Sequence, residues 1–333
     1  MIDKKSILIG ASILFALSSC TSKKKSVEEK PARIIQVPQF NADSAYIFVE
    51  QQVKFGPRVP NTKPHQQAAD YFINQFKKFG ATVITQDFDA TTWDNQKVQL
   101  KNIIASYNPQ AQKRILLAAH WDTRPYADKD GEKKDAPFDG ANDGASGVGV
   151  LLEVARVLSK SNSPTVGVDL ILFDGEDWGE KINEESKLKL PDGYEDWWCL
   201  GSQYWAKHKH KKNYTAYFGI LLDMVGAKHA QFFREWTSLE FAPTVVEKVW
   251  NTASRLGYTD YFVKANVAGI ITDDHVFVNK IGKIPMIDIV HYQTGVGFFG
   301  DYHHSRKDNL SIISKETLGA VGTTLLNVVY FEE

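Results

Sequence analysis

The chain has 333 residues, of which 43% are hydrophobic and 12% aromatic, so it can bury a full core and is neither disordered nor fibrous. The formal net charge of -1 at pH 7 provides no field that would attract nucleic acid or a charged membrane surface. We therefore expect no nucleic-acid partner, and any specificity must come from a local site.

Residues 1–20 have the pattern of an export signal. Basic residues precede an apolar stretch at 7–17 that is too short to span a bilayer, and small residues lead to Cys20. The run Leu-Ser-Ser-Cys resembles the lipobox of bacterial lipoproteins, in which the cysteine becomes the lipidated N-terminus. An ordinary secretory signal with an incidental cysteine is the alternative. We expect a lipoprotein signal peptide and an exported protein, lipid-anchored at Cys20 to a bacterial membrane on its periplasmic or cell-surface side.

Residues 21–40 are polar and charged, without hydrophobic periodicity, and predict a flexible tether. The chain has one other cysteine, Cys199, so lipidation of Cys20 would leave no intramolecular disulfide. The folded part, expected over residues 41–333, then depends on its core for stability.

Helical periodicity recurs along the folded part. Asp43 fits the N-cap of a helix that runs to Val53. A second helix is closed by Gly80, and its apolar face consists of Ala68, Phe72, Phe76 and Phe79. Further helices are predicted over residues 147–158 and 239–255, after Thr272, and from Lys315.

Apolar runs predict strands over residues 82–88, 97–107, 114–119, 168–173, 216–222 and 284–290. The run at 114–119 is the most continuously apolar and is expected at the centre of the sheet. Strands that alternate with helices, without an internal repeat, predict a single α/β domain. We expect a central twisted mixed sheet, mostly parallel and flanked by helices.

Three of these apolar runs lead into residues of the types that commonly bind metals. In an open α/β sheet, side chains at such positions project into a shared crevice. The candidate ligands are His120, Asp122, Asp143, Glu176, Asp177, Asp223 and His304. Nitrogen and carboxylate donors without thiolate suit Zn²⁺ in a catalytic site that keeps one position open. Any one of these carboxylates could instead cap a helix or pair with an arginine. Their recurrence at strand ends, together with two histidines, favours a metal site.

Motifs at these positions occur together in a known clan. They are His120-Trp-Asp, Gly140-Ala-Asn-Asp-Gly-Ala-Ser-Gly, Asp174-Gly-Glu-Asp, Leu222-Asp-Met-Val-Gly-Ala and His304-Ser-Arg-Lys-Asp. In this order they resemble the zinc aminopeptidase (M28) clan, which also contains the zinc-dependent, type II glutaminyl-peptide cyclotransferases. The resemblance extends from about Gly56 to the C-terminus.

Within the clan the chain resembles the cyclase branch, and bacterial lipoprotein cyclases in particular. The long motif from His120 to Asp128 and the run Thr272-Asp273-Asp274-His275 are similar to motifs of those enzymes. The tryptophan-rich loop with Trp178, Trp197 and Trp198 could wall an apolar pocket for a glutamine side chain, with Trp198 favoured. The neighbouring residues 180–196 are charged and are expected to form an exposed loop beside the site.

The resemblance implies specific roles. It makes Asp143, Asp177 and His304 the ligands of a single zinc, Glu176 the general base, and Asp223 and Asp273 acidic residues that hydrogen-bond one another and the substrate. His120 and Asp122 fall where aminopeptidases bind a second metal, so two zincs stay possible. In animal cyclases a tryptophan precedes the histidine ligand, and here His303 takes this place in the pocket wall. Asp288 replaces a histidine near Asp273 and would enlarge the acidic cluster.

The resemblance therefore implies a monomeric enzyme with one Zn²⁺ that converts the N-terminal Gln of peptides and proteins to pyroglutamate and releases ammonia. The alternative is a two-metal aminopeptidase of the same clan, which would hydrolyse N-terminal residues. A third possibility is a lipid-anchored binding protein that keeps the fold without catalysis.

Overall fold

A six-stranded mixed sheet forms the centre of the fold, in the order β1-β2-β4-β3-β5-β8. Its strands are β1 (Thr82–Thr91), β2 (Lys97–Tyr107), β3 (Arg114–His120), β4 (Gly167–Phe173), β5 (Phe218–Asp223) and β8 (Met286–Val290). β1 and β2 pair antiparallel, β2 pairs antiparallel with β4, and the remaining neighbours pair parallel. The predicted mixed, mostly parallel sheet with β3 in its interior is confirmed.

The computed structural model describes residues 35–332. The predicted signal peptide, the lipidation at Cys20 and most of the 21–40 tether lie outside the described residues. Within residues 35–332, no helix combines the length and the apolar character needed to cross a membrane.

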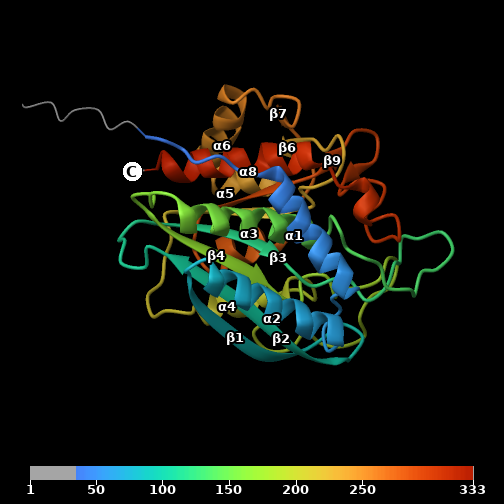
Figure 1. Cartoon of the computed structure of the whole chain (residues 1–333). Helices are drawn as coiled ribbons and strands as arrows, with labels where there is room; N and C mark the ends of the chain where they lie inside the picture. Colours follow the sequence, from blue (N-terminus) through green and yellow to red (C-terminus); the bar gives the residue numbers. More distant parts are fainter. Residues whose placement is uncertain (1–34, 333) are drawn as a thin grey trace, which may run out of the picture. The chain divides into compact units, whose positions relative to one another are not determined.

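Every residue of β3, β4 and β5 is buried because helices cover both faces of the sheet. One face packs against α1 (Ala42–Phe55), α2 (Lys63–Lys78), α3 (Ala145–Lys160) and α8 (Lys315–Tyr330), and Figure 1 shows α1, α3 and α8 gathered on this side. The other face packs against α4 (Leu200–Lys207) and α7 (Asp274–Lys280). Along β3, Ile115 and Leu117 enter the first core while Leu116 and Ala118 enter the second, as the two-residue period of a strand requires.

Smaller elements complete the described structure. They are α5 (Trp236–Phe241), α6 (Pro243–Arg255), the pair β6 (Phe232–Arg234) and β7 (Phe262–Asn266), the hairpin β9 (Tyr292–Gln293) and β10 (Gly297–Phe298), and the 3₁₀ helix η1 (Leu310–Ile312).

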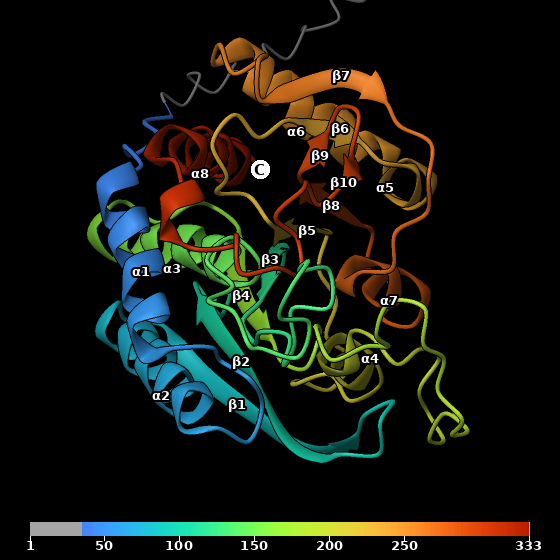
Figure 2. The ribbon, with the colours of Figure 1, turned by 90° about the vertical axis from the view of Figure 1, so that its right-hand side faces the viewer.

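The order in which the chain adds strands to the sheet reverses at β3, although β3 runs parallel to both of its neighbours. From β3 the chain passes through α3 to β4 on one side, and later reaches β5 on the other side of β3. Ligands of open α/β sheets bind outside the carboxyl ends of the strands at such a switch point. In Figure 2 the segment between β3 and α3 lies in front of these strand ends.

Two helix boundaries differ from the sequence prediction, one at the N-cap of α1 and one just before Pro243. Asn41, rather than Asp43, caps α1, because its side chain accepts the Ser44 N–H at 2.8 Å. The predicted 239–255 helix is two helices, since Ala242 leaves helical geometry ahead of Pro243, which occupies the first turn of α6.

The close approach of α1 and α3 generates a stability prediction. A Cβ at Gly149 of α3 would lie 2.6 Å from Val49 Cγ2 and 3.0 Å from the Ala45 carbonyl oxygen of α1. We expect Gly149→Ala to lower the free energy of unfolding by about 1–3 kcal/mol in chemical denaturation, because the helices must separate. The matched control is Gly319→Ala in α8, whose Cβ would meet nothing closer than 3.4 Å. That change should be neutral or stabilising through helix propensity, and equal effects of the two changes would refute the packing argument.

Candidate active site

The predicted site residues converge at the carboxyl edge of the parallel strands. His120 and Asp223 are the last residues of β3 and β5, and Glu176 and Asp177 stand in the turn that follows β4. Parallel pairing in register brings His120 beside Phe173, so the ends of β3 and β4 lie level. Asp143 comes from the turn before α3, His303 and His304 from the loop between β10 and η1, and Asp273 from the start of α7.

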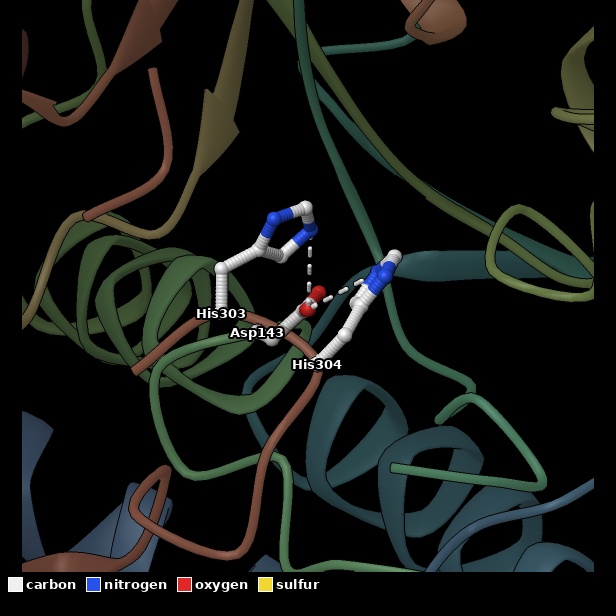
Figure 3. A group of neighbouring side chains, drawn as sticks. All are labelled: Asp143, His303 and His304. Atoms are coloured by element: carbon white, nitrogen blue, oxygen red, sulfur yellow. Dashed lines mark ion pairs between the residues drawn. The ribbon is translucent and has the colours of Figure 1, made fainter. Parts of the chain in front are cut away.

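Asp143, Asp177 and His304 meet at one point. His304 Nε2 lies 2.9 Å from Asp177 Oδ1 and 3.8 Å from Asp143 Oδ2. His303 Nε2 lies 3.9 Å from Asp143 Oδ2, and Figure 3 shows both imidazoles directed at this carboxylate. Neither Asp143 Oδ2 nor Asp177 Oδ1 makes a hydrogen bond with any part of the chain that the structure describes.

These carboxylates fit a bound cation. Burial raises the pKa of Asp143 to about 6 and that of Asp177 to about 7. A buried carboxylate oxygen without a hydrogen bond is costly, and a divalent metal held by oxygen and imidazole nitrogen removes the cost. The donor set is therefore suited to a metal such as zinc.

His120 belongs to a second group that shares Asp143. Its Nε2 lies 3.1 Å from Asp143 Oδ1 and 3.2 Å from Asp223 Oδ1, which is the distance of a hydrogen bond. Asp122 Oδ1 is 3.6 Å from His120 Nδ1, but the Asp122 carboxylate also accepts the backbone N–H groups of Glu176 and Asp177 at 3.1 and 3.2 Å. Asp122 thus holds the turn after β4 in place.

Glu176 faces the cavity with few partners of its own. Its Oε1 accepts a hydrogen bond from the Cys199 thiol at 3.3 Å, and polar atoms of Glu176, Cys199 and Asp273 lie within 4.8 Å of one another. Burial, opposed by His120 and reinforced by Asp273, raises the pKa of Glu176 well above its ordinary value. A carboxyl with a raised pKa is suited to take up and return a proton near neutral pH.

Asp273 and Asp288 form an acidic layer at the back of the site. Asp273 lines the cavity and caps α7 by accepting the Asp274 N–H, and burial raises its pKa to about 6. Asp288, in β8, is fully buried and does not line the cavity. Polar atoms of Asp273, His275 and Asp288 lie within 4.8 Å of one another, as the predicted acidic cluster requires.

A cavity of about 280 Å³ opens onto these groups. It is lined by Arg124, Asp128, Lys129, Asp143, Glu176, Asp177, Glu180, Ile182, Trp198, Asp223, Met224, Thr272, Asp273, Phe299, His303 and His304. A larger groove of about 1030 Å³, between α2 and the β1–β2 hairpin, contains none of the predicted site residues.

The structure separates the two candidate tryptophans. Trp198 lines the cavity with its ring parallel to that of His304, at 5.8 Å between ring centroids. Trp197 does not line it but packs in an apolar cluster with Trp93 and Tyr126. Trp197 therefore lies outside the cavity in which it was predicted, because its ring packs in this separate apolar cluster.

Arg124 and Asp128 contact both the cavity wall and the candidate metal ligands Asp177 and His304. Neither residue was assigned a role from the sequence. The buried Arg124 guanidinium donates to both Asp128 oxygens, at 3.0 and 2.8 Å, and lies 4.6 Å from the Trp198 ring centroid. The backbone N–H of Arg124 donates to Asp177 Oδ2 at 2.9 Å, and Asp128 Oδ1 is 3.6 Å from His304 Nδ1. Arg124 and Asp128 together therefore contact Asp177, His304 and the Trp198 ring.

The same arginine holds the loop that follows the site. Its guanidinium donates to the carbonyl oxygens of residues 177, 179 and 180 at 3.2, 3.2 and 2.8 Å. Asp128 Oδ2 accepts the Ile182 N–H at 2.9 Å. The start of the 180–196 loop is thus fixed against the cavity, while residues 183–185 are exposed as expected.

Further residues hold the turn that carries Asp143 and the side chain of His303 in place. Arg58, fully buried, donates to the carbonyl oxygens of Asp139 and Gly140, while Asp308 accepts the N–H groups of residues 142 and 143. Lys129 Nζ donates to His303 Nδ1 at 2.5 Å. The four-residue spacing of Arg124 and Asp128 was a visible signal in the sequence, but the partners of the other groups are distant along the chain.

Comparison with known proteins agrees with this geometry. The model for "Peptidase family M28" matches residues 102–329. The chain belongs to peptidase family M28. The match contains all the motifs that suggested the resemblance, from His120 to His304.

The chain is also similar to two solved structures and to a relative of known sequence. A glutaminyl cyclase of Bacteroides thetaiotaomicron bound to N-acetylhistamine is 46% identical, covers 90% of this chain and 100% of its own, and superposes with a TM-score of 0.84. A Zn-dependent exopeptidase of Parabacteroides distasonis is 49% identical over 89% of this chain and 100% of its own, also at 0.84. The glutaminyl-peptide cyclotransferase of Drosophila melanogaster is 23% identical over 287 residues, 78% of this chain and 73% of its own.

The Arg124–Asp128 pair generates a second prediction. Arg124→Met removes the cation that pairs with the buried Asp128 carboxylate and the donor that three carbonyl oxygens share. The free energy of unfolding should therefore fall by about 3–5 kcal/mol in chemical denaturation. Arg306→Met is the control, because Arg306 makes a similar contact with Asp130 but at the surface. A loss for Arg124→Met no larger than that for Arg306→Met would contradict the positioning role.

Proposed function

We propose that this M28 protein is a glutaminyl-peptide cyclotransferase, which converts an N-terminal glutamine to pyroglutamate and releases ammonia. The observation that carries the proposal is the 46% identity to a bacterial glutaminyl cyclase over 90% of the chain. The cavity of about 280 Å³ supports it, because this volume suits one amino-acid side chain better than a long peptide.

The proposed cofactor is one zinc ion held by Asp143, Asp177 and His304. The unpaired, buried oxygens of the two aspartates beside His304 Nε2 support this ligand set. When bound, zinc supplies a Lewis acid for the γ-carbonyl oxygen of the substrate glutamine. The hydrogen-bond distances from His120 Nε2 to Asp143 and Asp223 support a single ion, since they leave His120 engaged without a second metal.

The chain's own residues account for the proton movements of the proposed reaction. Glu176 takes a proton from the substrate α-amine as that nitrogen attacks the carbonyl carbon of the side-chain amide, and returns it to the departing ammonia. Asp223 and Asp273, which both line the cavity, accept N–H groups of the substrate. Trp198 and His303 flank the glutamine side chain and restrict it to folded conformations, which favours intramolecular ring closure.

An M28 aminopeptidase is the second candidate. The polar atoms of His120, Asp143 and Asp223 lie within 4.8 Å of one another and could hold another metal, and the similar protein of Parabacteroides distasonis is named an exopeptidase. Glu176 would then activate water instead of an amine. A binding protein without catalysis is the least supported, because the proposed base and ligands are all present.

The proposal extends to location. The pattern of residues 1–20 supports export and a lipid anchor at Cys20, and we propose a monomer that acts on peptides or proteins outside the cytoplasm. Labelling with a radioactive fatty acid, compared between the wild-type protein and Cys20→Ser, tests the anchor.

Product analysis tests the activity. The purified protein, incubated with a Gln-initiated peptide, should release one ammonia per peptide and lower the peptide mass by that amount. Removal of metal with a chelator should abolish the reaction, and zinc should restore it with one ion per chain by elemental analysis. Release of a free amino acid with two ions per chain would instead establish the aminopeptidase, and no product at all would leave a binding protein.

Glu176→Gln tests the proposed base. The amide cannot take up the proton, so turnover should fall by about 10²- to 10⁴-fold while the zinc content and the thermal stability stay at wild-type values. Glu184→Gln in the exposed part of the 180–196 loop is the matched control and should keep full activity. An undiminished rate for Glu176→Gln would rule out this residue as the base.

A further inference from the structure

Cys199 stands where the proposed base is fixed. It is fully buried, and its Sγ lies 3.3 Å from Glu176 Oε1. Among the residues that the structure describes, this thiol is the one group that donates a hydrogen bond to the Glu176 carboxylate. The other nearby donor, His120 Nδ1, is 3.8 Å from Oε2, which is beyond hydrogen-bond distance.

The backbone supports the same contact. The Cys199 N–H donates to the Glu176 carbonyl oxygen and the Leu200 N–H to that of Gly175, both at 3.0 Å. The first turn of α4 also lies against the turn after β4, since a Cβ at Gly201 would come within 2.3 Å of the Asp174 carbonyl oxygen. The thiol is therefore held against Glu176 by rigid neighbours on both sides.

The conformation of Cys199 is uncommon for its residue type. Its φ of 58° lies in the left-handed region, which favours glycine or asparagine at such a position. It is also the N-cap of α4 but makes no side-chain cap hydrogen bond. The side chain therefore contributes through its contact with Glu176 and not through helix capping.

We propose that the Cys199 thiol is a positioning group for the reaction, which donates to Glu176 Oε1 and so turns Oε2 toward the substrate proton. This inference rests on the proposed role of Glu176 as the base. Burial raises the pKa of the thiol well above its ordinary value, so the sulfur keeps the proton that it donates. A freely rotating carboxylate would spend part of its time with neither oxygen aligned.

Kinetics of two substitutions test the proposal. Cys199→Ala should lower kcat about fivefold with KM within twofold of wild type, because one hydrogen bond to a carboxylate is lost while the pocket is unchanged. Cys199→Ser keeps a donor and should restore kcat to within about twofold. Val276→Ala removes volume from the same apolar cluster without touching Glu176 and should keep wild-type kcat. Wild-type kcat in Cys199→Ala, or an equal loss in Cys199→Ser or Val276→Ala, would overturn the proposal.

Infrared spectroscopy gives a readout that does not depend on activity. The S–H stretching band of Cys199 is isolated as the difference between wild-type and Cys199→Ala spectra. In Glu176→Ala this band should move to the position of a thiol without a hydrogen bond. An unchanged band would overturn the proposal even if the enzyme is active. Failure of the wild type to release ammonia from a Gln-initiated peptide would instead overturn the proposed function, and the band would still decide the contact.

Discussion

Negative charge buried at the carboxyl ends of β3, β4 and β5 is the constraint on which the rest of the site depends. Asp122, Asp143, Glu176, Asp177, Asp223 and Asp273 are all buried there. Ionised carboxylates cannot be kept together in a low dielectric unless cations or N–H groups compensate them. The raised pKa values of Asp143, Asp177 and Asp223, about 6, 7 and 6 after burial, show that the described side chains compensate them incompletely. A bound cation is the compensation that this donor set accepts.

Two buried arginines supply positive charge that partly compensates these buried carboxylates. Arg58 binds the carbonyl oxygens of the turn that carries Asp143, and Arg124 binds those of the turn that carries Asp177. Each therefore fixes the backbone beneath one of the two carboxylates proposed as zinc ligands, and Arg124 also lies 3.9 Å from Asp177 Oδ1. Asp143 Oδ2 and Asp177 Oδ1 stay without a hydrogen bond within the described residues, and the positive charge lowers the cost of burying the two carboxylates.

The apolar periodicity was sufficient to predict the fold because each central strand is buried on both faces and each strand end leads into a polar turn. His120, Asp177 and Asp223 could be predicted as neighbours for the same reason. The sequence could not choose between Trp197 and Trp198, which are adjacent and chemically alike, because the direction of the loop decides which ring enters the cavity. It also could not reveal Cys199 as a partner of Glu176, since that contact requires the left-handed backbone at the start of α4. Asn41 and Asp43 are both good caps, and tertiary contacts decided between them: the Asn41 N–H also donates to Glu153.

Asp143 connects the metal position to the choice between cyclisation and hydrolysis. Its Oδ2 faces His303 and His304, and its Oδ1 faces His120 Nε2 at 3.1 Å. Such a carboxylate can bridge two metals, or it can bind one metal and accept a hydrogen bond from an imidazole. In the second arrangement His120 holds no metal and instead donates a hydrogen bond to Asp143. The proposed ring closure needs no water, because the nucleophile belongs to the substrate. The proposed cyclase and the alternative aminopeptidase therefore differ in what His120 Nε2 contacts, a carboxylate or a second metal, while Glu176 is the proposed base in both.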